Sequence, residues 1–212
     1  MLQYRAVYPT TLELLRKLMF LPELQDFFLV GGTALALQLG HRISIDIDLF
    51  TQKDFNTRKL FIKLNKQFNI SDLNEDTNTL NFNIAFPEKS NNIVKIDLIK
   101  YSYPLIKPVL EIDKIRLLTV EDIIPMKLSA VAGRGSKKDF YDIYYLLKSY
   151  SLEKMFELFK KKFPNINEFH ILKSLTYFED AELEPKPQMI KKTDWNIVKA
   201  KITDETNRYI NK

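Results

Sequence analysis

Two acidic residues lie in a segment whose alternating pattern is typical of a β-strand, and together they could bind divalent cations. The segment from Ser44 to Phe50 alternates between polar and apolar residues, with Ser44, Asp46 and Asp48 on its polar face. Its apolar face begins with Ile45. Residues two apart on a strand have Cα atoms roughly 6.5 to 7 Å apart. Like charges this close are unfavourable unless a cation neutralises them, and hard oxygen ligands suit Mg²⁺ or Mn²⁺.

The residues before these acids have the pattern of a strand, a glycine turn and a short helix. Phe27 to Val30 is an apolar run of strand length, and Gly31-Gly32 ends it. Thr33 is expected to cap a helix from Ala34 to Leu39, and Gly40 is expected to close that helix. This unit would lead the chain directly into the acidic strand.

Two further segments alternate and are expected to pair as a hairpin. They are Leu80 to Phe86 and Ile93 to Ile99, joined by a turn-rich linker from Pro87 to Asn92. The second strand carries Asp97 on the face opposite to its apolar residues. In a continuous sheet, Asp97 would lie near the strand that holds Asp46 and Asp48.

The remaining pattern predicts helices around this sheet and a second, helical half of the chain. Thr10 to Met19 and the segment that follows Asp54 have apolar residues at helical spacing. The region 104–118 is irregular, so we expect an α/β domain over residues 1–110 and a helical domain over residues 111–212. The predicted fold class is therefore α+β, with a small mixed sheet, flanking helices and a C-terminal helical domain.

Capping signals mark the first helices of the predicted C-terminal domain. Thr119 with Asp122 resembles a capping box and should open a helix that ends near Gly133. Pro125 lies inside this helix and is expected to kink or split it. A second capping box, Ser136 with Asp139, should open the next helix.

Composition and charge describe an ordinary globular protein with a mild basic excess. The chain has 45% hydrophobic and 28% charged residues and a net charge of +5. It contains no cysteine, which excludes disulfides and thiolate metal sites and fits a reducing cytoplasm. The apolar runs are too short to cross a membrane, and the N-terminus lacks a signal-peptide pattern, so a cytoplasmic protein without membrane contact is expected. Basic clusters at residues 127–138 and 160–162 suit a phosphate-bearing substrate, a nucleic acid or simply a solvated surface.

The order and spacing of these motifs resembles the nucleotidyltransferase superfamily related to DNA polymerase beta. The matching signature is Gly31-Gly32, a spacer, Asp46-Ile-Asp48 and a carboxylate on a later strand, here Asp97. The fuller sequence of residues 31–50 is similar to the AbiEii/AbiGii toxin family, bacterial nucleotidyltransferase-like toxins that are usually encoded beside an antitoxin. The second motif of that family matches Lys127, Arg134 and Lys138-Asp139-Phe-Tyr-Asp142.

The resemblance implies a role for each member of these motifs. Asp46, Asp48 and Asp97 would be the catalytic residues and the ligands of Mg²⁺ or Mn²⁺, and Asp97 could also orient or deprotonate the attacking hydroxyl. The residues that would bind the nucleotide are Gly31, Gly32, Thr33, Ser44, Lys127, Arg134 and Asp139. Functional and structural roles both stay open for Arg42, Lys138 and Asp142.

The implied activity is metal-dependent transfer of a nucleoside monophosphate from a nucleoside triphosphate to an acceptor, with release of pyrophosphate. The acceptor would be an RNA such as tRNA, or a protein. The chain would be the toxin of a toxin–antitoxin or phage-defence system, with a cognate antitoxin as its partner. The active site is expected in a cleft between the nucleotidyltransferase α/β domain and the helical domain. Two alternatives stay open: a catalytically silent module of this fold that binds a nucleotide or a partner, and nucleotidyl transfer to a small molecule such as an aminoglycoside.

Overall fold

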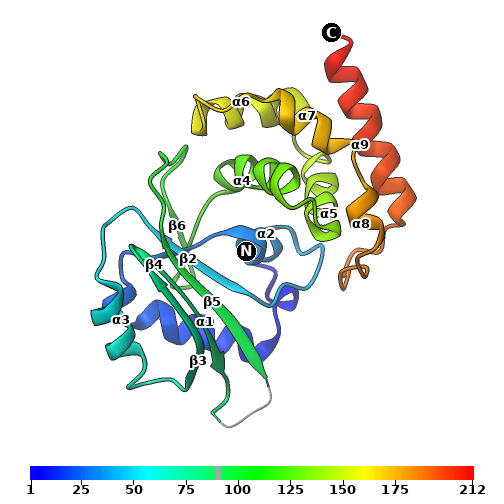
Figure 1. The fold of residues 1–212 in the computed structure, drawn as a ribbon. Coiled ribbons are helices and arrows are strands. Elements are labelled where there is room, and N and C mark those ends of the chain that lie inside the picture. Colours follow the sequence, from blue (N-terminus) through cyan, green and yellow to red (C-terminus); the bar gives the residue numbers. More distant parts are fainter. Residues whose placement is uncertain (89–91) are drawn as a thin grey trace. The chain divides into compact units, whose positions relative to one another are not determined.

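The computed structural model describes residues 1–88 and 92–212, and its contacts divide the chain into two compact units. Unit 1 contains Met1–Gly40, Ser44–Tyr103 and Val109–Leu118, and unit 2 contains His41–Ile43, Pro104–Pro108 and Thr119–Lys212. In Figure 1, unit 1 holds the strands and most of the blue-to-green chain, and unit 2 holds the helices coloured green to red. Residues 89–91 of the predicted linker lie outside the described residues. In the described ranges, no helix has the length and apolar character needed to cross a membrane.

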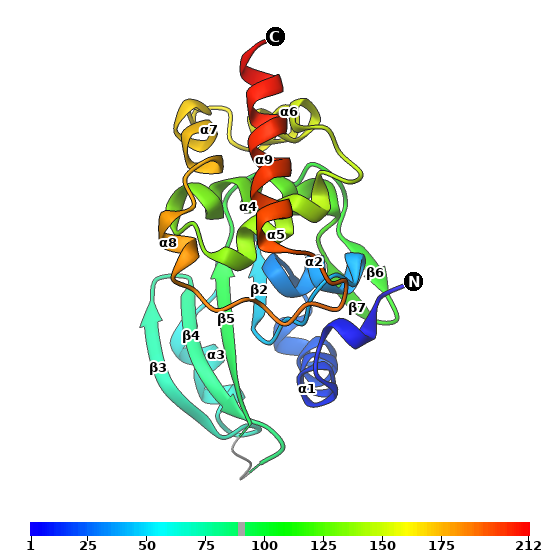
Figure 2. The same ribbon diagram turned by 90° about the vertical axis from the view of Figure 1, so that its right-hand side faces the viewer.

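Unit 1 is built on one mixed sheet of seven strands in the order β3-β4-β5-β2-β1-β7-β6 (Figures 1 and 2). The strands are β1 (Phe28–Leu29), β2 (Ile47–Thr51), β3 (Ile70–Asp76), β4 (Thr79–Ala85), β5 (Ile93–Lys100), β6 (Leu110–Ile112) and β7 (Ile115–Leu117). β4 and β5 form the predicted hairpin, and β5 pairs in parallel with β2. The predicted continuous sheet and the α+β fold class are therefore confirmed.

Helices cover the apolar face of this sheet. The helices in the described part of unit 1 are α1 (Pro9–Phe20), α2 (Gly31–Leu39) and α3 (Thr57–Leu64), with short 3₁₀ turns η1 (Tyr4–Ala6) and η2 (Pro22–Leu24). α1 contacts β7, and α3 contacts β3 and β4. The buried apolar face of β2, β4 and β5 consists of Ile47, Leu49, Leu80, Phe82, Ile84, Val94, Ile96 and Leu98. Because side chains alternate along a strand, the polar residues between them occupy the other face.

Two elements near the acidic strand begin at residues that differ from the prediction. β2 begins at Ile47 rather than Ser44, and Ile45, expected on the apolar face, is 53% exposed. α2 begins at Gly31, so Thr33 lies inside the helix instead of capping it. The hydroxyl of Thr33 donates a hydrogen bond to the backbone carbonyl of Asp46. Ser44 forms an isolated parallel bridge with Val7, which lies outside the named strands.

A hairpin occupies part of the region that is predicted to be irregular. β6 and β7 pair with each other, and β7 also pairs in parallel with β1. The turn residues Asp113 and Lys114 both have positive φ, which is the geometry of a tight two-residue hairpin turn. Neither residue is a glycine, so the sequence carries a weak turn signal here. Unit 1 consequently extends to Leu118 instead of ending at residue 110.

Unit 2 is helical. Its helices are α4 (Val120–Gly133), α5 (Lys137–Leu146), α6 (Leu152–Lys162), α7 (Phe169–Leu175), α8 (Glu179–Glu182) and α9 (Trp195–Ile210). The Thr119 side chain caps α4 by accepting the N–H of Asp122, as predicted. α4 runs through Pro125 as one helix, so the predicted split is wrong. Proline removes one backbone hydrogen bond, and the burial of Ile124 and Leu128 on either side of it holds the helix together.

A buried ion pair connects α4 with α6. Asp122 Oδ1 lies 2.7 Å from Lys162 Nζ, and neither side chain has any exposed surface. The carboxylate also accepts the backbone N–H groups of Ile106 and Lys107 at 2.8 and 2.9 Å, and Lys162 donates to the carbonyl of Pro104 at 3.0 Å. Lys162 is therefore not part of the basic surface cluster expected at the end of α6, because its charge is used inside unit 2.

Replacing Lys162 with methionine should destabilise the protein strongly. The variant keeps the volume of the side chain but leaves the Asp122 carboxylate buried without its cation, which costs about 3 kcal/mol or more. Urea unfolding followed by circular dichroism measures the change. Lys161→Met is the matched control, because Lys161 is the exposed neighbour on the same helix, and it should stay within about 0.5 kcal/mol of wild type. Equal stability of the two variants would contradict the structural role of the pair.

Candidate functional site

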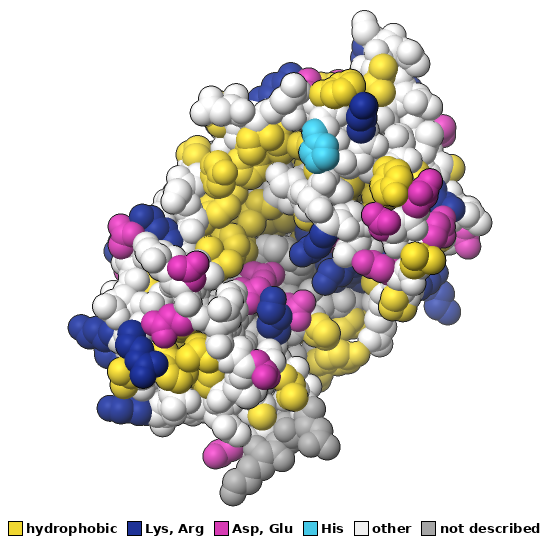
Figure 3. Space-filling view, viewed as in Figure 1, with side chains coloured by type: hydrophobic (Ala, Val, Ile, Leu, Met, Phe, Trp, Pro, Cys, Tyr) yellow, Lys and Arg dark blue, Asp and Glu magenta, His cyan; other side chains and the backbone are white. Residues whose placement is uncertain are grey.

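The predicted carboxylates of unit 1 come together on the polar face of the sheet. β2 and β5 are parallel neighbours, and Asp48 is the direct register partner of Asp97. Partner residues on adjacent strands project to the same face, with Cα atoms about 5 Å apart. Asp46 precedes β2 by one residue, and all three acids are partly exposed. Figure 3 shows acidic and basic side chains side by side on one face of the molecule.

Lys95 belongs to this acidic face and is not among the predicted residues. It lies on β5 two residues before Asp97, so the alternation that placed Asp97 on the polar face also places Lys95 there. Lys95 Nζ lies 2.8 Å from Asp97 Oδ2, and Asn81 of β4 donates to Asp97 Oδ1 at 2.9 Å. The hydrogen bond to Asp97 raises the pKa of Lys95 against the effect of burial, and the charges of Asp97, Asp48 and Asp46 raise it further.

Gly31 brings the start of α2 against the carboxylate of Asp48. Its φ is +66°, a conformation that residues with a Cβ rarely adopt. A Cβ on Gly31 would lie 2.5 Å from Asp48 Oδ2, which is too close for any side chain. The first N–H groups of a helix have no acceptor within the helix, and they carry partial positive charge. Gly31 and Gly32 therefore place donors for an anion directly beside the acidic face.

Thr33 and Ser44 hold the backbone of Asp46 in place. Their hydroxyl oxygens lie 3.0 Å apart, and their residues are 1% and 7% exposed. Thr33 also hydrogen-bonds to the Asp46 carbonyl. These contacts couple Asp46 to the first turn of α2, which is a positioning role. The predicted nucleotide contact of these two hydroxyls stays a prediction.

The chemistry of this face suits a divalent metal ion. Three carboxylates supply hard oxygen atoms, and two of them, Asp48 and Asp97, are fixed in register on neighbouring strands. Among residues 1–88 and 92–212, no three His, Cys, Asp or Glu side chains already lie close enough to hold a metal ion. One oxygen of Asp97 is instead paired with Lys95. The donor set thus fits a metal ion, and its carboxylates would have to converge to bind one.

The predicted residues of unit 2 form a second cluster, in which charges alternate. Lys127 Nζ lies 3.1 Å from Asp139 Oδ1 and 2.6 Å from Asp142 Oδ2. The Lys127 side chain is 4% exposed, and neither aspartate has exposed side-chain surface. The ammonium group is thus enclosed between two carboxylates, which gives Lys127 a structural role. Its predicted contact with a phosphate stays a prediction.

Arg134 is the exposed member of this cluster. Its Nε and Nη2 donate to the two oxygens of Asp139 at 2.7 and 3.0 Å, while 56% of its side chain remains exposed. Burial would raise the pKa of Asp139, but the hydrogen bond from Arg134 and the charge of Lys127 lower it overall. Asp139 therefore fixes the plane of a guanidinium that solvent can reach. The side chain of Ser136 does not cap α5, so the capping box predicted with Asp139 is wrong, because that carboxylate is already used.

Asp142 ties the segment 41–43 to α5. Arg42 Nε and Nη2 donate to its two oxygens at 2.7 and 2.9 Å, and His41 Nε2 lies 2.7 Å from Oδ1. Burial would raise the pKa of Asp142, but the charges of Arg42 and Lys127 hold it well below its ordinary value. Burial lowers the pKa of His41. Of the three residues whose roles stayed open, Arg42 and Asp142 are structural by these contacts, and Lys138 is half-buried.

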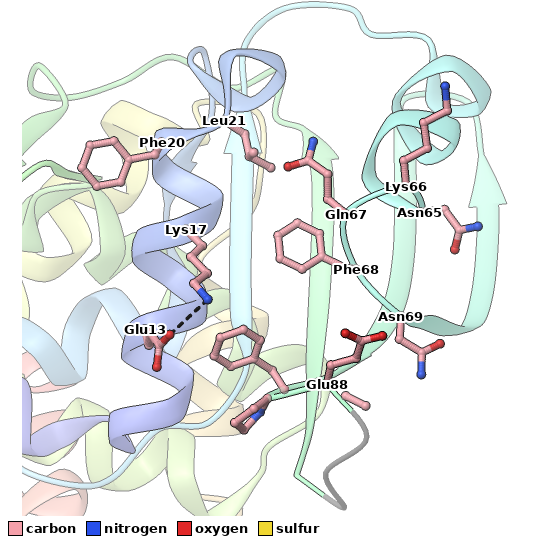
Figure 4. A pocket seen from close by; sticks show the side chains of 13 residues that line it. Glu13, Lys17, Phe20, Leu21, Asn65, Lys66, Gln67, Phe68, Asn69 and Glu88 are labelled. Atoms are coloured by element: carbon pink, nitrogen blue, oxygen red, sulfur yellow. Dashed lines mark ion pairs between the residues drawn. The ribbon is translucent and has the colours of Figure 1, made fainter.

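A cavity of about 970 Å³ in unit 1 is separate from both clusters (Figure 4). Its walls come from α1, the segment after α3 and the end of β4, with Lys17, Phe20, Phe68 and Phe86 among the lining residues. Lys17 pairs with Glu13 at 3.1 Å across one side of it. The lining residues include none of the predicted site residues. The candidate site is therefore identified by its charged residues and by the register of their strands, and it does not coincide with this cavity.

Gly31→Ala should destabilise unit 1 and displace the carboxylate of Asp48. The substitution meets both a positive φ and a 2.5 Å contact, so we expect a loss of about 2 kcal/mol or more in urea unfolding. Gly133→Ala is the matched control, because no atom lies within 4 Å of its Cβ position and it sits in α4. A helical Gly→Ala change should be neutral or stabilising by up to about 1 kcal/mol. Similar effects at both glycines would contradict the close approach.

Stability should fall between pH 7.5 and pH 5.5 because of His41. Burial lowers the pKa of His41, so below about pH 6.5 the unfolded chain binds a proton more readily than the folded chain, and the free energy of unfolding falls as the pH is lowered. Urea unfolding at the two pH values measures the slope. His41→Asn should remove it, and His170→Asn should keep it because His170 is exposed. A slope that survives in His41→Asn would contradict this assignment.

Comparison with known proteins agrees with this geometry. The family model described as "Nucleotidyl transferase AbiEii toxin, Type IV TA system" matches residues 13–209. An uncharacterized protein of Aquifex aeolicus is 36% identical over 178 residues, which cover 81% of this chain and 83% of that protein.

Solved structures share the fold. JHP933 from Helicobacter pylori has a TM-score of 0.61 at 20% identity and covers 95% of this chain and 92% of its own. A structure titled as a putative nucleotidyltransferase from H. pylori has a TM-score of 0.60 at 19% identity, with 95% of each chain covered. MenT4, a nucleotidyltransferase toxin of Mycobacterium tuberculosis, has a TM-score of 0.57 at 12% identity and covers 93% of this chain and 81% of its own. With the family model matched over most of its length, the chain belongs to the AbiEii nucleotidyltransferase toxin family of type IV toxin–antitoxin systems.

Proposed function

We propose that this protein transfers a nucleoside monophosphate from a nucleoside triphosphate to an RNA or protein acceptor in a reaction that requires Mg²⁺ or Mn²⁺, and that it acts as a toxin kept in check by a cognate antitoxin. The observation that carries the proposal is the parallel register of Asp48 with Asp97, beside the N-terminus of α2. In the reaction, an acceptor hydroxyl oxygen attacks the α-phosphorus. The bond from that phosphorus to the bridging oxygen breaks, and pyrophosphate leaves.

The acidic face would hold the divalent ions and the phosphates. Asp48 and Asp97 would bind the ions from neighbouring strands, and Asp46 would add oxygen ligands from the residue before β2. When bound, such ions neutralise the phosphates and stabilise the charge that develops on the leaving oxygen. The N–H groups of Gly31 and Gly32 would donate to phosphate oxygens, since the close approach at Gly31 leaves the backbone uncovered by a side chain.

Asp97 would also receive or orient the proton of the attacking hydroxyl. Asn81 donates to one oxygen of Asp97 and so limits the directions in which the carboxylate can turn. The other oxygen faces Lys95. The hydrogen bond from Asn81 thus partly pre-organises the carboxylate, and pre-organisation is the main contribution that a protein makes to phosphoryl transfer.

In unit 2, Arg134 is the residue we assign to contact with an anionic group of the nucleotide or the acceptor. Its guanidinium is oriented by two hydrogen bonds to Asp139 and remains half-exposed. Lys127, enclosed between Asp139 and Asp142, would support this arrangement through these two carboxylates. Of the two basic residues, Arg134 is the one that solvent, and therefore an anion, can reach more readily.

Asp48→Asn should abolish transfer while the protein stays folded. The purified protein is incubated with each α-labelled nucleoside triphosphate, Mg²⁺ or Mn²⁺, and total RNA or protein extract, and label incorporation is measured. Removing one charged ligand should lower incorporation about a hundredfold or more. Asp26→Asn is the matched control, because Asp26 is an exposed residue of unit 1 that pairs with the exposed Lys53, and it should keep full activity.

The outcome separates the alternatives. Tight binding of nucleotide and metal by calorimetry, without pyrophosphate release from any acceptor, would instead identify a silent binding module. Label that appears only on an added aminoglycoside would identify a small-molecule transferase. Label that persists equally in Asp48→Asn would remove the acidic face from the chemistry. Growth arrest on expression of wild type, but not of Asp48→Asn, would connect the chemistry to the toxin role.

A further inference from the structure

Lys95 is a basic residue placed in the middle of an acidic site. On β5 it lies two residues before Asp97, and across the strands its backbone partner on β4 is Asn83. Its ammonium is 2.8 Å from Asp97 Oδ2. The ammonium therefore pairs with one of the three carboxylates to which the proposed function assigns metal ions.

A divalent ion and the Lys95 ammonium would compete for this oxygen of Asp97. Metal–oxygen bonds to Mg²⁺ are about 2.0 to 2.1 Å long, so an ion bound to this oxygen would lie close to an ammonium that is 2.8 Å from the same atom. The ion would also repel the ammonium at such short range.

Lys95 can leave without disturbing the sheet. Its side chain is 56% exposed, whereas that of Asp97 is 14% exposed and is also held by Asn81. A lysine side chain is a flexible four-carbon stem that carries a point charge, so it can turn to a new anion while its backbone stays in β5. In a loaded site the nearest new anion would be a phosphate of the nucleotide.

We propose that Lys95 is an internal counter-cation of the acidic face, which competes with the first divalent ion for Asp97 and, once displaced, pairs with a phosphate of the bound nucleotide. The second half of this statement rests on the function proposed above, and the first half does not. Lys95 would thereby couple the binding of metal and nucleotide. A metal ion that binds alone must displace the lysine from Asp97, which weakens metal binding. When a nucleoside triphosphate binds as well, the displaced lysine gains a phosphate as its new partner.

The test measures Mn²⁺ binding in the absence of nucleotide, by electron paramagnetic resonance of the free ion. Lys95→Met should bind Mn²⁺ about tenfold more tightly than wild type, because the competitor is gone. Lys95→Arg keeps the charge and should keep an affinity near that of wild type. Lys100→Met is the matched control on the same strand, because Lys100 pairs with Asp54 at 2.7 Å, and it should leave Mn²⁺ affinity unchanged.

A second arm measures binding of a non-hydrolysable nucleoside triphosphate at saturating Mn²⁺. Lys95→Met should weaken it about fivefold or more, with no effect on the nucleoside that lacks phosphates, and Lys95→Arg should restore it. A purely structural lysine would lower thermal stability and move neither constant in these directions.

Mn²⁺ affinity that is unchanged or weaker in Lys95→Met, or no Mn²⁺ binding by any of the variants, would overturn the inference. Nucleotidyl transfer by wild type together with unchanged Mn²⁺ affinity in Lys95→Met would overturn it while leaving the proposed function intact. Tighter Mn²⁺ binding by Lys95→Met without any transfer by wild type would overturn the proposed function, whereas the inferred competition for Asp97 would stand.

Discussion

The repulsion between carboxylates on neighbouring strands is the constraint around which unit 1 is arranged. The parallel register of β2 and β5 sets Asp48 beside Asp97, and Asp46 stands one residue before the strand. Such an arrangement costs free energy unless positive charge is supplied. The fold supplies it in two ways: the N-terminus of α2, which only a glycine can bring so near to Asp48, and the ammonium of Lys95.

The acidic face of unit 1 and the charge cluster of unit 2 differ in how the repulsion between their carboxylates is compensated. In the cluster of unit 2, Asp139 and Asp142 are fully buried, and each is met by at least two cationic side chains, so their charges are neutralised inside the fold. In unit 1 the three acids are partly exposed, and Asp97 pairs with the exposed Lys95. A neutralised, buried cluster stabilises structure, because breaking it leaves a charge without a partner. A partly exposed acidic cluster is suited to binding exchangeable cations.

The sequence predicted local features and missed those that depend on distant partners. Alternation located β4, β5 and the acids, and helical spacing located most helices, because these signals lie within one segment. The residues around the start of α2 and the start of β2 make contacts with distant partners, such as the bond from Thr33 to the Asp46 carbonyl and the bridge between Ser44 and Val7, which no local pattern reveals. Likewise, Lys162 and Lys127 read as surface cations until Asp122, Asp139 and Asp142 are seen to bury them. The alternation that places Asp97 on the polar face of its strand also places Lys95 there. A single lysine on a strand is usually a solvated residue, so the pattern alone does not assign it to the site.

The discontinuous make-up of unit 2 limits how this chain can be divided. Residues 41–43 and 104–108 belong to it although segments of unit 1 separate them from the main segment, which begins at Thr119. A fragment that begins at Thr119 would contain Asp142 without Arg42 and His41, and Asp122 without the N–H groups of Ile106 and Lys107. Two buried carboxylates would thus lose partners at once. Truncation or recombination at a single junction before Thr119 would therefore destabilise the helical unit, because it separates these carboxylates from partners that come earlier in the chain.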